Sequence, residues 1–200
     1  MYTPSFNRIA DRTLLIEAMR SHSFALLSGG EPLSATHLPL AVKDEGEHGV
    51  LEGHFALANP HWQALAGRET LVVFTGPHSY VSPTLYEEPT SVPTWNYIAV
   101  HACGKLSLVE DADAKDTLLG GLFSAFEPAF AERWAQMPED YRRAMLAGIV
   151  GFRIPIERIE GKFKLGQNRP ETDRQTMRAA FAAGDSDQQA LAAWMQKLAV

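Results

Sequence analysis

Apolar residues recur every three or four positions in several stretches of the chain, which predicts amphipathic helices. The broadest apolar stripe lies in 111–126, where leucines and phenylalanines gather on one helical face. Pro170 suits the first turn of a later helix, and Gly184 suits its end. The predicted helices are 11–22, 61–66, 111–126, 137–146, 170–183 and a last one that begins at the Ser186-x-x-Gln189 capping pattern.

Other stretches alternate apolar and polar residues or are apolar throughout, which predicts strands. In 50–57 the alternation places Leu51, Phe55 and Leu57 toward a core and Glu52 and His54 on the opposite face, which is polar or lines a cavity. Gly104 indicates a bend or bulge. These features indicate an α+β fold, with about six strands closed into a barrel and helices outside it. The predicted strands are 24–27 and 35–42, paired as a hairpin, then 50–57, 70–75, 96–109 and 149–159.

The run from Phe74 to Lys105 leads from a strand through a long loop into the next strand. Its four prolines restrict the backbone, and a loop this long is either functional or disordered. Aromatic residues argue against disorder, because they are scarce in unfolded chains and common where a planar ligand is held. An ordered loop that closes over the core or over a partner subunit is the alternative. The aromatic residues are Tyr80, Tyr86, Trp95 and Tyr97.

The length of 200 residues fits one domain, 1–200, in which 170–200 is a helical extension that packs on the domain or on a partner subunit. No apolar run reaches the length of a membrane span, and the first residues lack the apolar core of a signal peptide, so we expect a cytoplasmic protein. Cys103 is the single cysteine. The net charge of −6 gives no general attraction for nucleic acid, so direct DNA binding is doubtful.

The stretch 161–169, GKFKLGQNR, is the best candidate for binding an anion. Its cationic side chains crowd around two glycines, and glycines let backbone N–H groups approach a ligand closely. The helix that follows adds the positive end of its dipole. A phosphate needs this combination, although a solvated basic loop would have the same composition. The candidate donors are Lys162, Lys164, Gln167, Asn168 and Arg169.

Several common chemistries have no motif in this chain. A Rossmann glycine pattern, a P-loop and a hydrolase nucleophile elbow do not occur, and the histidines never have the spacing of a metal site. An aromatic loop and a basic glycine segment together describe a site for a flat heterocycle that carries a phosphate, and FMN fits this description. Another planar ligand, such as haem or pyridoxal phosphate, is the alternative, with His37, His54 or His101 as a haem ligand.

The sequence resembles the PaiB-type FMN-binding negative transcriptional regulators. The resemblance covers nearly the whole chain, and blocks such as VPTWNY and EGKFKLGQN in this order are specific to the family. It implies a split β-barrel like that of the pyridoxamine-phosphate oxidase and flavin-reductase flavoproteins, assembled as a homodimer with FMN at the subunit interface. The matching segments are MYTPSFN (1–7), THLPL (36–40), GHFALANPHW (53–62), VVFTGPHSYVSP (72–83), VPTWNYIAVHACG (92–104) and IVGFRIPIERIEGKFKLGQNR (149–169).

The resemblance also implies the cofactor-binding residues. Two departures from the family pattern, Gly166 in place of a serine and Leu85 in place of an aromatic residue, would weaken FMN binding. Beside the flavin we expect His37, Leu38 and Pro39; around its ring and ribityl chain Ser82, Tyr86, Trp95, Asn96 and Tyr97; and near its phosphate or the flavin of the other subunit Lys164, Gln167, Asn168 and Arg169.

Two functions agree with this site. The resemblance favours a negative transcriptional regulator that acts through a flavin-bound homodimer. The alternative is an FMN-dependent oxidoreductase that takes electrons from NAD(P)H and passes them through the flavin to a small acceptor, a chemistry that needs few acid or base groups from the protein. His101 and Tyr97 are then the candidate proton donors.

Overall fold

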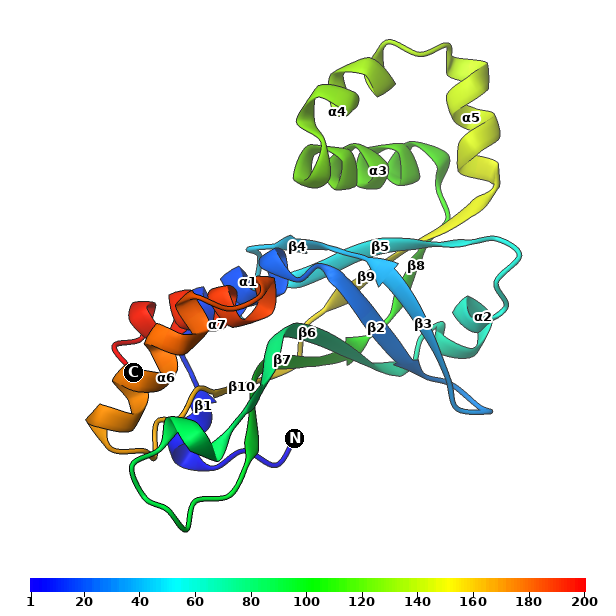
Figure 1. Ribbon diagram of the computed structural model, residues 1–200. Helices are drawn as coiled ribbons and strands as arrows, with labels where there is room; N and C mark the ends of the chain where they lie inside the picture. Colours follow the sequence, from blue (N-terminus) through cyan, green and yellow to red (C-terminus); the bar gives the residue numbers. More distant parts are fainter. The chain divides into compact units, whose positions relative to one another are not determined.

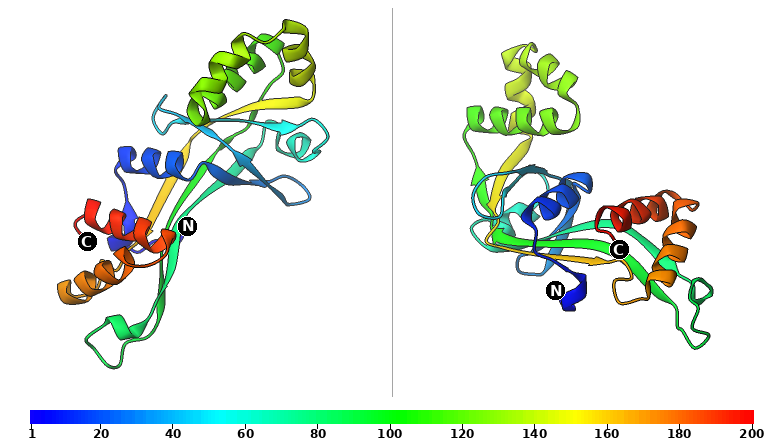
Figure 2. Two further views of the ribbon diagram at one scale, coloured as in Figure 1. Left: turned by 45° about the horizontal axis from the view of Figure 1, so that its top comes forward. Right: turned by 90° about the vertical axis from the view of Figure 1, so that its left-hand side faces the viewer.

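The computed structural model describes residues 1–200 and divides them into two compact units. Unit 1 consists of Met1–Ala18, Thr75–Val100 and Glu160–Val200, and unit 2 of Met19–Phe74 and His101–Ile159. Figures 1 and 2 label or colour the elements along the chain. Each unit is described by itself below.

The ten strands fall into two sheets. The six-stranded sheet has the order β1-β10-β7-β6-β2-β3, and the four-stranded sheet has the order β4-β5-β9-β8. Every pair with a known register is antiparallel. The strands are β1 (Arg8–Ile9), β2 (Phe24–Gly29), β3 (Ser34–Pro39), β4 (Ala41–Lys43), β5 (Val50–Ala56), β6 (Glu69–Val81), β7 (Thr94–Lys105), β8 (Ser107–Val109), β9 (Ile149–Pro155) and β10 (Arg158–Lys164).

Seven α-helices accompany the sheets, and none is both long and apolar enough to cross a membrane. Asp111 caps α3 through its side chain, and Asp185 and Gln188 form a reciprocal capping box at α7. The helices are α1 (Arg12–Ser21), α2 (His61–Leu65), α3 (Ala112–Phe126), α4 (Pro128–Ala135), α5 (Glu139–Ala147), α6 (Glu171–Ala182) and α7 (Ser186–Lys197).

The core of unit 2 lies around the pairing of β5 with β9 and beneath α3. Gly53 faces Phe152 across this pair, and the rings of Phe55 and Phe152 lie 5.0 Å apart. A second apolar cluster joins α3, α4 and α5, where the Trp134 indole donates a hydrogen bond of 2.6 Å to the Asp116 carboxylate. This cluster also includes Ala41 of β4, so the three helices, which follow one another between β8 and β9 (Figure 1), pack on that strand.

Unit 1 is held together by the end of β10 and the last two helices. Lys162 and Gly161 of β10 pair with β1. The Phe163 ring meets the Trp194 ring of α7 edge-on at 5.1 Å, and both side chains are buried. Gln188 of α7 donates to the Ser79 hydroxyl of β6 at 3.1 Å. The last helix therefore packs on strands of its own unit.

The helix predictions are confirmed within one or two residues at each end, apart from two points. Helix α4 was not predicted, although it begins at Pro128 and proline is favoured in a first helical turn. The capping box belongs to Asp185 and Gln188 rather than to Ser186 and Gln189. The C-terminal extension predicted for 170–200 consists of α6 and α7.

Several strand predictions were wrong in their bounds. The predicted strand 35–42 is divided into β3 and β4, which belong to different sheets, and 149–159 is likewise divided into β9 and β10. Strand β6 continues to Val81, so nearly half of it lies in what we expected to be loop. Residues 161–164 are the end of β10 rather than the start of a basic loop. A proline or a charged residue lies near each of these breaks. The alternation pattern did not locate the strand ends, because the length of a strand depends on its pairing partners, which the sequence does not show.

The predicted faces of β5 are confirmed for Leu51 and Phe55, which are fully buried, and wrong for Leu57 and Glu52. Glu52 is 9% exposed, whereas Leu57 is 51% exposed and lies beyond the strand end. The burial of Glu52 is compensated by two cations, because Arg153 approaches it to 2.9 Å and Lys43 to 3.9 Å. The α+β class and the antiparallel sheets are as predicted, while closure of six strands into one barrel and a single domain for 1–200 stay predictions.

Candidate functional site

The aromatic loop and the basic segment meet in unit 1. The Arg169 guanidinium carbon lies 3.8 Å from the centre of the Tyr86 ring, and Arg169 Nη1 donates a hydrogen bond of 3.3 Å to the Ser91 hydroxyl. Burial raises the pKa of Tyr86, while the neighbouring Arg169 opposes this rise. Two segments that are nearly eighty residues apart in sequence are thus joined by a stacked cation.

Three cations gather at the end of β10 and in the loop after it. The Lys164 ammonium donates to the Thr94 hydroxyl at the start of β7. Partial burial lowers the pKa of Lys164, and the neighbouring charges of Lys162 and Arg169 lower it further, against an opposing effect of Tyr97. No carboxylate forms an ion pair with any of the three. The cluster therefore carries a local positive charge in a protein whose net charge is −6.

The loop after β10 is held by its own glutamine. The Gln167 side chain donates to the Phe163 carbonyl at 2.5 Å and accepts a hydrogen bond of 2.8 Å from the Leu165 N–H. The Arg169 N–H donates to the Gly166 carbonyl at 2.8 Å, which closes a turn. Asn168 lies exposed at this turn. Gln167 thus supports the segment that carries Lys164 and Arg169, with both ends of its amide engaged inside the loop.

Gly166 has a φ of +90°, a backbone conformation that favours glycine, and a Cβ there would collide with the terminal methyl of Met177. We therefore expect Gly166→Ser, which restores the residue of the family pattern, to lower the free energy of unfolding by about 1–2 kcal/mol. Urea unfolding of the variant beside the parent chain measures this loss. An unchanged or increased stability would contradict it, and Gly46→Ser, at a positive φ with open space around it, separates backbone strain from the collision.

The rings on β6 and β7 form an exposed aromatic group in unit 1. Trp95 is 52% exposed and Tyr80 is 49% exposed, and their ring centres lie 6.2 Å apart. His78 stacks on Trp95 at 6.0 Å. The Lys162 ammonium lies 5.3 Å from the centre of the Tyr97 ring. Because residues of a strand alternate, Trp95 and Tyr97 share the more exposed face of β7.

The structure places Asn96 and Ser82 differently from these rings. Asn96 is 1% exposed, its amide nitrogen contacts the Met177 sulfur at 3.2 Å, and its carbonyl oxygen has no partner. Asn96 therefore lies on the opposite face of β7 from Trp95. Ser82 accepts a hydrogen bond of 3.3 Å from the Thr84 N–H and begins the short 3-10 turn Pro83–Leu85. Its position fixes the loop that leads to Tyr86.

The remaining predicted residues belong to unit 2. His37, Leu38 and Pro39 lie on β3, where the His37 ring stacks on Phe24 of β2 at 5.7 Å. His101 is partly exposed on β7. The structure therefore brings together Tyr86, Lys164 and Arg169, with Tyr97 beside the same lysines, and leaves the β3 residues and His101 in the other unit.

A polar cluster next to His37 was missed by the sequence analysis. His61 is buried, and its Nδ1 lies 2.9 Å from the Thr36 hydroxyl, to which Asn59 also donates at 3.3 Å. The signal was the Asn59-Pro60-His61 sequence, which the sequence analysis used only to place the start of the predicted helix 61–66. The cluster fixes β3 against α2.

Burial lowers the pKa of His54 below its usual 6.5, and its Nδ1 has no hydrogen-bond partner. The unfolded chain therefore binds a proton at a higher pH than the folded chain. His54 contributes stability above pH 6.5 that is lost as the pH falls toward the folded pKa. We expect His54→Gln to reduce the difference in unfolding free energy between about pH 7.5 and about pH 5.5, while His48→Gln, in a surface turn, leaves it unchanged. Equal pH dependence in both variants would contradict this.

Comparison with known proteins gives three findings. Residues 1–158 match the family model described as "Putative FMN-binding domain". Over 182 residues the chain is 37% identical to the protease synthase and sporulation protein PAI 2 of Bacillus subtilis (strain 168), a match that covers 86% of this chain and 85% of that protein. Among solved structures, the fold resembles the flavocytochrome Anf3 of Azotobacter vinelandii (TM-score 0.61, 13% identity, 79% of this chain and 69% of that chain).

The fold of this chain also resembles an FAD and heme binding protein of Mycobacterium smegmatis (TM-score 0.62, 17% identity, 79% of this chain and 73% of that chain). At these sequence identities, the two solved structures are evidence for the fold alone. The family model and the Bacillus relative together cover the loop, β6, β7 and β9, and they confirm both the PaiB-type resemblance and the prediction of FMN as cofactor. The chain belongs to the FMN-binding family that this model describes.

Proposed function

We propose that unit 1 holds the phosphate of FMN at Lys162, Lys164 and Arg169, and that the aromatic residues beside them hold the ribityl chain and the ring. The observation that carries this proposal is the group of three neighbouring cations without a carboxylate partner. A phosphate supplies the missing negative charge and accepts several hydrogen bonds at once. FMN itself supplies redox chemistry when bound, and the residues of the chain bind and orient it.

The pKa of Lys164 also supports a phosphate at this site. Partial burial and the like charges of Lys162 and Arg169 lower the pKa of Lys164. The negative charge of a bound phosphate would offset both of these unfavourable effects on the lysine cation. Tyr86 and Tyr97 already contact cations of the cluster, so a flat ring can lie near the phosphate end without further rearrangement. His37, Leu38 and Pro39 remain a separate prediction for the flavin, which His37→Ala tests.

A titration with FMN and with riboflavin tests the proposed phosphate site. Riboflavin has the same ring and ribityl chain without the phosphate. We expect FMN to bind at least about a hundredfold more tightly, the effect of two charge-assisted hydrogen bonds to the phosphate. Equal affinities would exclude the cationic cluster as the phosphate site, and an absorption spectrum that lacks the flavin bands after reconstitution would exclude FMN.

We further propose that the chain acts as a homodimer and that its strands close into a six-stranded split barrel. The resemblance supports both, and the exposed rings of Trp95 and Tyr80 support the dimer, since contiguous exposed apolar groups mark interaction surfaces. Sedimentation of the FMN-saturated protein at several concentrations tests the assembly. A mass of one chain at all concentrations would exclude the dimer.

The role that we propose for this dimer is negative transcriptional regulation, as the PaiB-type resemblance implies. The name of the Bacillus relative associates that protein with protease synthesis and sporulation. Acidic residues occupy the first turns of α3, α5, α6 and α7, unlike the basic N-terminal turn of a DNA-recognition helix. A mobility-shift assay with competitor DNA distinguishes direct binding from regulation through a partner.

An FMN-dependent oxidoreductase is the second candidate. Tyr97 favours it, because its phenol lies on the more exposed face of β7 with the Lys162 ammonium 5.3 Å from its ring. His101 occupies the same face of the strand further along. Anaerobic NADH or NADPH should then bleach the oxidised flavin band near about 450 nm. An unchanged band with both nucleotides would exclude NAD(P)H as the electron donor.

A further inference from the structure

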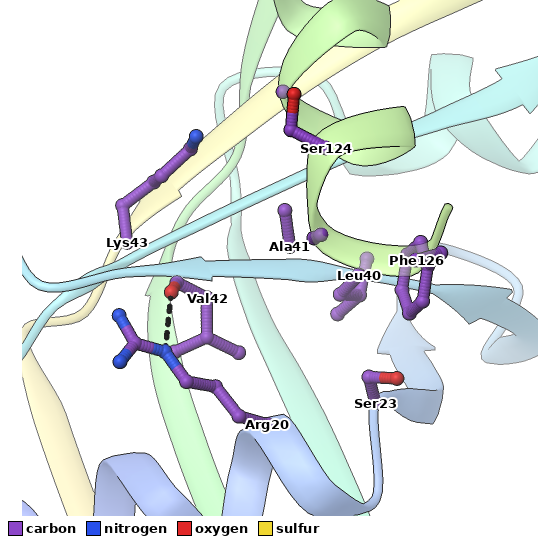
Figure 3. Close-up of a pocket in the computed structure, with 10 residues that line it drawn as sticks. Arg20, Ser23, Leu40, Ala41, Val42, Lys43, Ser124 and Phe126 are labelled. Atoms are coloured by element: carbon purple, nitrogen blue, oxygen red, sulfur yellow. Dashed lines mark hydrogen bonds between the residues drawn. The ribbon is translucent and has the colours of Figure 1, made fainter. Parts of the chain in front are cut away.

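A cavity of about 390 Å³ lies within unit 2, between the end of α1, strand β4 and the last turn of α3. Its volume falls at the lower end of the range of small-molecule sites, about 300–1,000 Å³. Figure 3 shows Leu40, Ala41 and Val42 along one wall, with Phe126 and Ser23 beside them. Leu40, which precedes β4, and Ala41 and Val42 of β4 are buried, so this wall is apolar and fixed in place.

The polar groups of the cavity are cations and hydroxyls. Arg20, Lys43, Ser23 and Ser124 line it, and no aspartate or glutamate does, although the chain carries 24 acidic residues. Lys43 is already near a carboxylate, since its Nζ lies 3.9 Å from Glu52. The free positive charge of the cavity is therefore that of Arg20.

Arg20 is held in position without being neutralised. Its Nε donates a hydrogen bond of 3.0 Å to the Val42 carbonyl, which leaves the two terminal nitrogens of the guanidinium available (Figure 3). The Ser23 carbonyl accepts a hydrogen bond of 2.9 Å from the Leu40 N–H, which fixes Ser23 at the same wall while its hydroxyl keeps no protein partner. An oriented guanidinium and a hydroxyl at an apolar cavity are the donors that a carboxylate requires.

Two neighbouring glycines of α3 differ in their surroundings, and of the two only Gly121 lines the cavity. A Cβ on Gly121 would lie 3.0 Å from Lys43 Nζ, so glycine lets the helix approach β4 closely. Gly120 has no atom within 4 Å of an added Cβ. One turn later, Ser124, Ala125 and Phe126 continue the lining of the cavity on the α3 side.

We propose that this cavity binds a small monocarboxylate with an apolar body, whose carboxylate meets Arg20 and whose body lies against Leu40, Val42 and Phe126. The site uses none of the residues proposed for FMN. It would give the protein a ligand other than its flavin, of the chemical class of aromatic or branched-chain acids.

Calorimetric titration of the full-length, FMN-saturated protein with phenylacetate tests the proposal. We expect saturable binding, about tenfold weaker in Arg20→Met and about tenfold weaker for the neutral analogue phenylacetamide. Ala125→Leu, which fills the mouth, should also weaken binding, whereas Gly120→Leu, one turn earlier and facing open space, should not. Ala125→Leu keeps the test valid if Arg20→Met fails to fold.

Three results would overturn the proposal. They are an absence of phenylacetate binding up to about 10 mM, equal affinity for phenylacetate and phenylacetamide, and binding that neither Arg20→Met nor Ala125→Leu changes. Each is independent of flavin binding, because the FMN spectrum of every variant is recorded before the titration. A loss of that spectrum would concern the FMN site and not the cavity.

Discussion

Replacing Lys164 and Arg169 together, as Lys164→Met and Arg169→Gln, is expected to weaken FMN binding by at least about a hundredfold at low salt. Each replacement removes a cation that would donate to the phosphate, and a hydrogen bond to a charged group contributes about 1.5–3 kcal/mol. Since about 1.4 kcal/mol is tenfold in affinity, two such losses give the expected factor. Fluorescence titration with FMN measures the change.

The controls separate this loss from damage to the fold. Riboflavin affinity should remain within about threefold of the parent value, because the proposal assigns both replaced cations to the phosphate, which riboflavin lacks. Arg143→Gln, an exposed ion-paired arginine of α5, should leave FMN binding unchanged. Because burial lowers the pKa of Lys164, its charge is costly in the folded protein, so Lys164→Met should not reduce stability. A parallel loss of riboflavin affinity would contradict the assignment.

The second large effect is expected at Gly104. A Cβ there would collide with the Pro155 carbonyl oxygen and lie 2.9 Å from the Ile154 Cγ2, so a backbone must shift to accept it. We expect Gly104→Ala to lower the free energy of unfolding by about 2–3 kcal/mol, the upper range for overpacking. At about 2–4 °C per kcal/mol for a chain of this size, the melting temperature falls accordingly.

The matched control is the same substitution where space is open. Gly120→Ala, in the interior of α3, should raise stability by about 0.5–1 kcal/mol, because alanine forms helix better than glycine and meets no neighbour. Thermal and urea unfolding of the two variants measure opposite shifts. If Gly104→Ala is as stable as the parent chain, the close approach of β7 to the end of β9 is not as described.

Periodicity in the sequence predicted the helices well because their signal is local. Leu118, Leu119 and Leu122 lie on one face within a turn of each other, and all three are buried against α4, α5 and β4. Strand bounds depended on partners elsewhere in the chain. Nothing local to Ala35–Val42 indicates that its two halves pair in different sheets.

The candidate site was predicted in part, for a similar reason. Charge and glycine content in 161–169 indicated an anion site, and the structure adds that Gln167 serves the loop itself. The contact between Arg169 and Tyr86 could not be inferred from spacing, because it joins separate segments. The Arg20 cavity had no sequence signal at all, since its residues come from three elements with ordinary compositions.

Strands β6, β7 and β10 each pass from one unit into the other, so neither unit is a continuous piece of the gene product. Cutting the polypeptide at a single peptide bond would not release an intact half. A fragment ending at residue 158, where the family match ends, would lack nearly all of β10 and with it Lys162, Lys164 and Arg169. Dissection of this protein by truncation therefore removes the proposed phosphate ligands first, and point substitutions are the more informative tool.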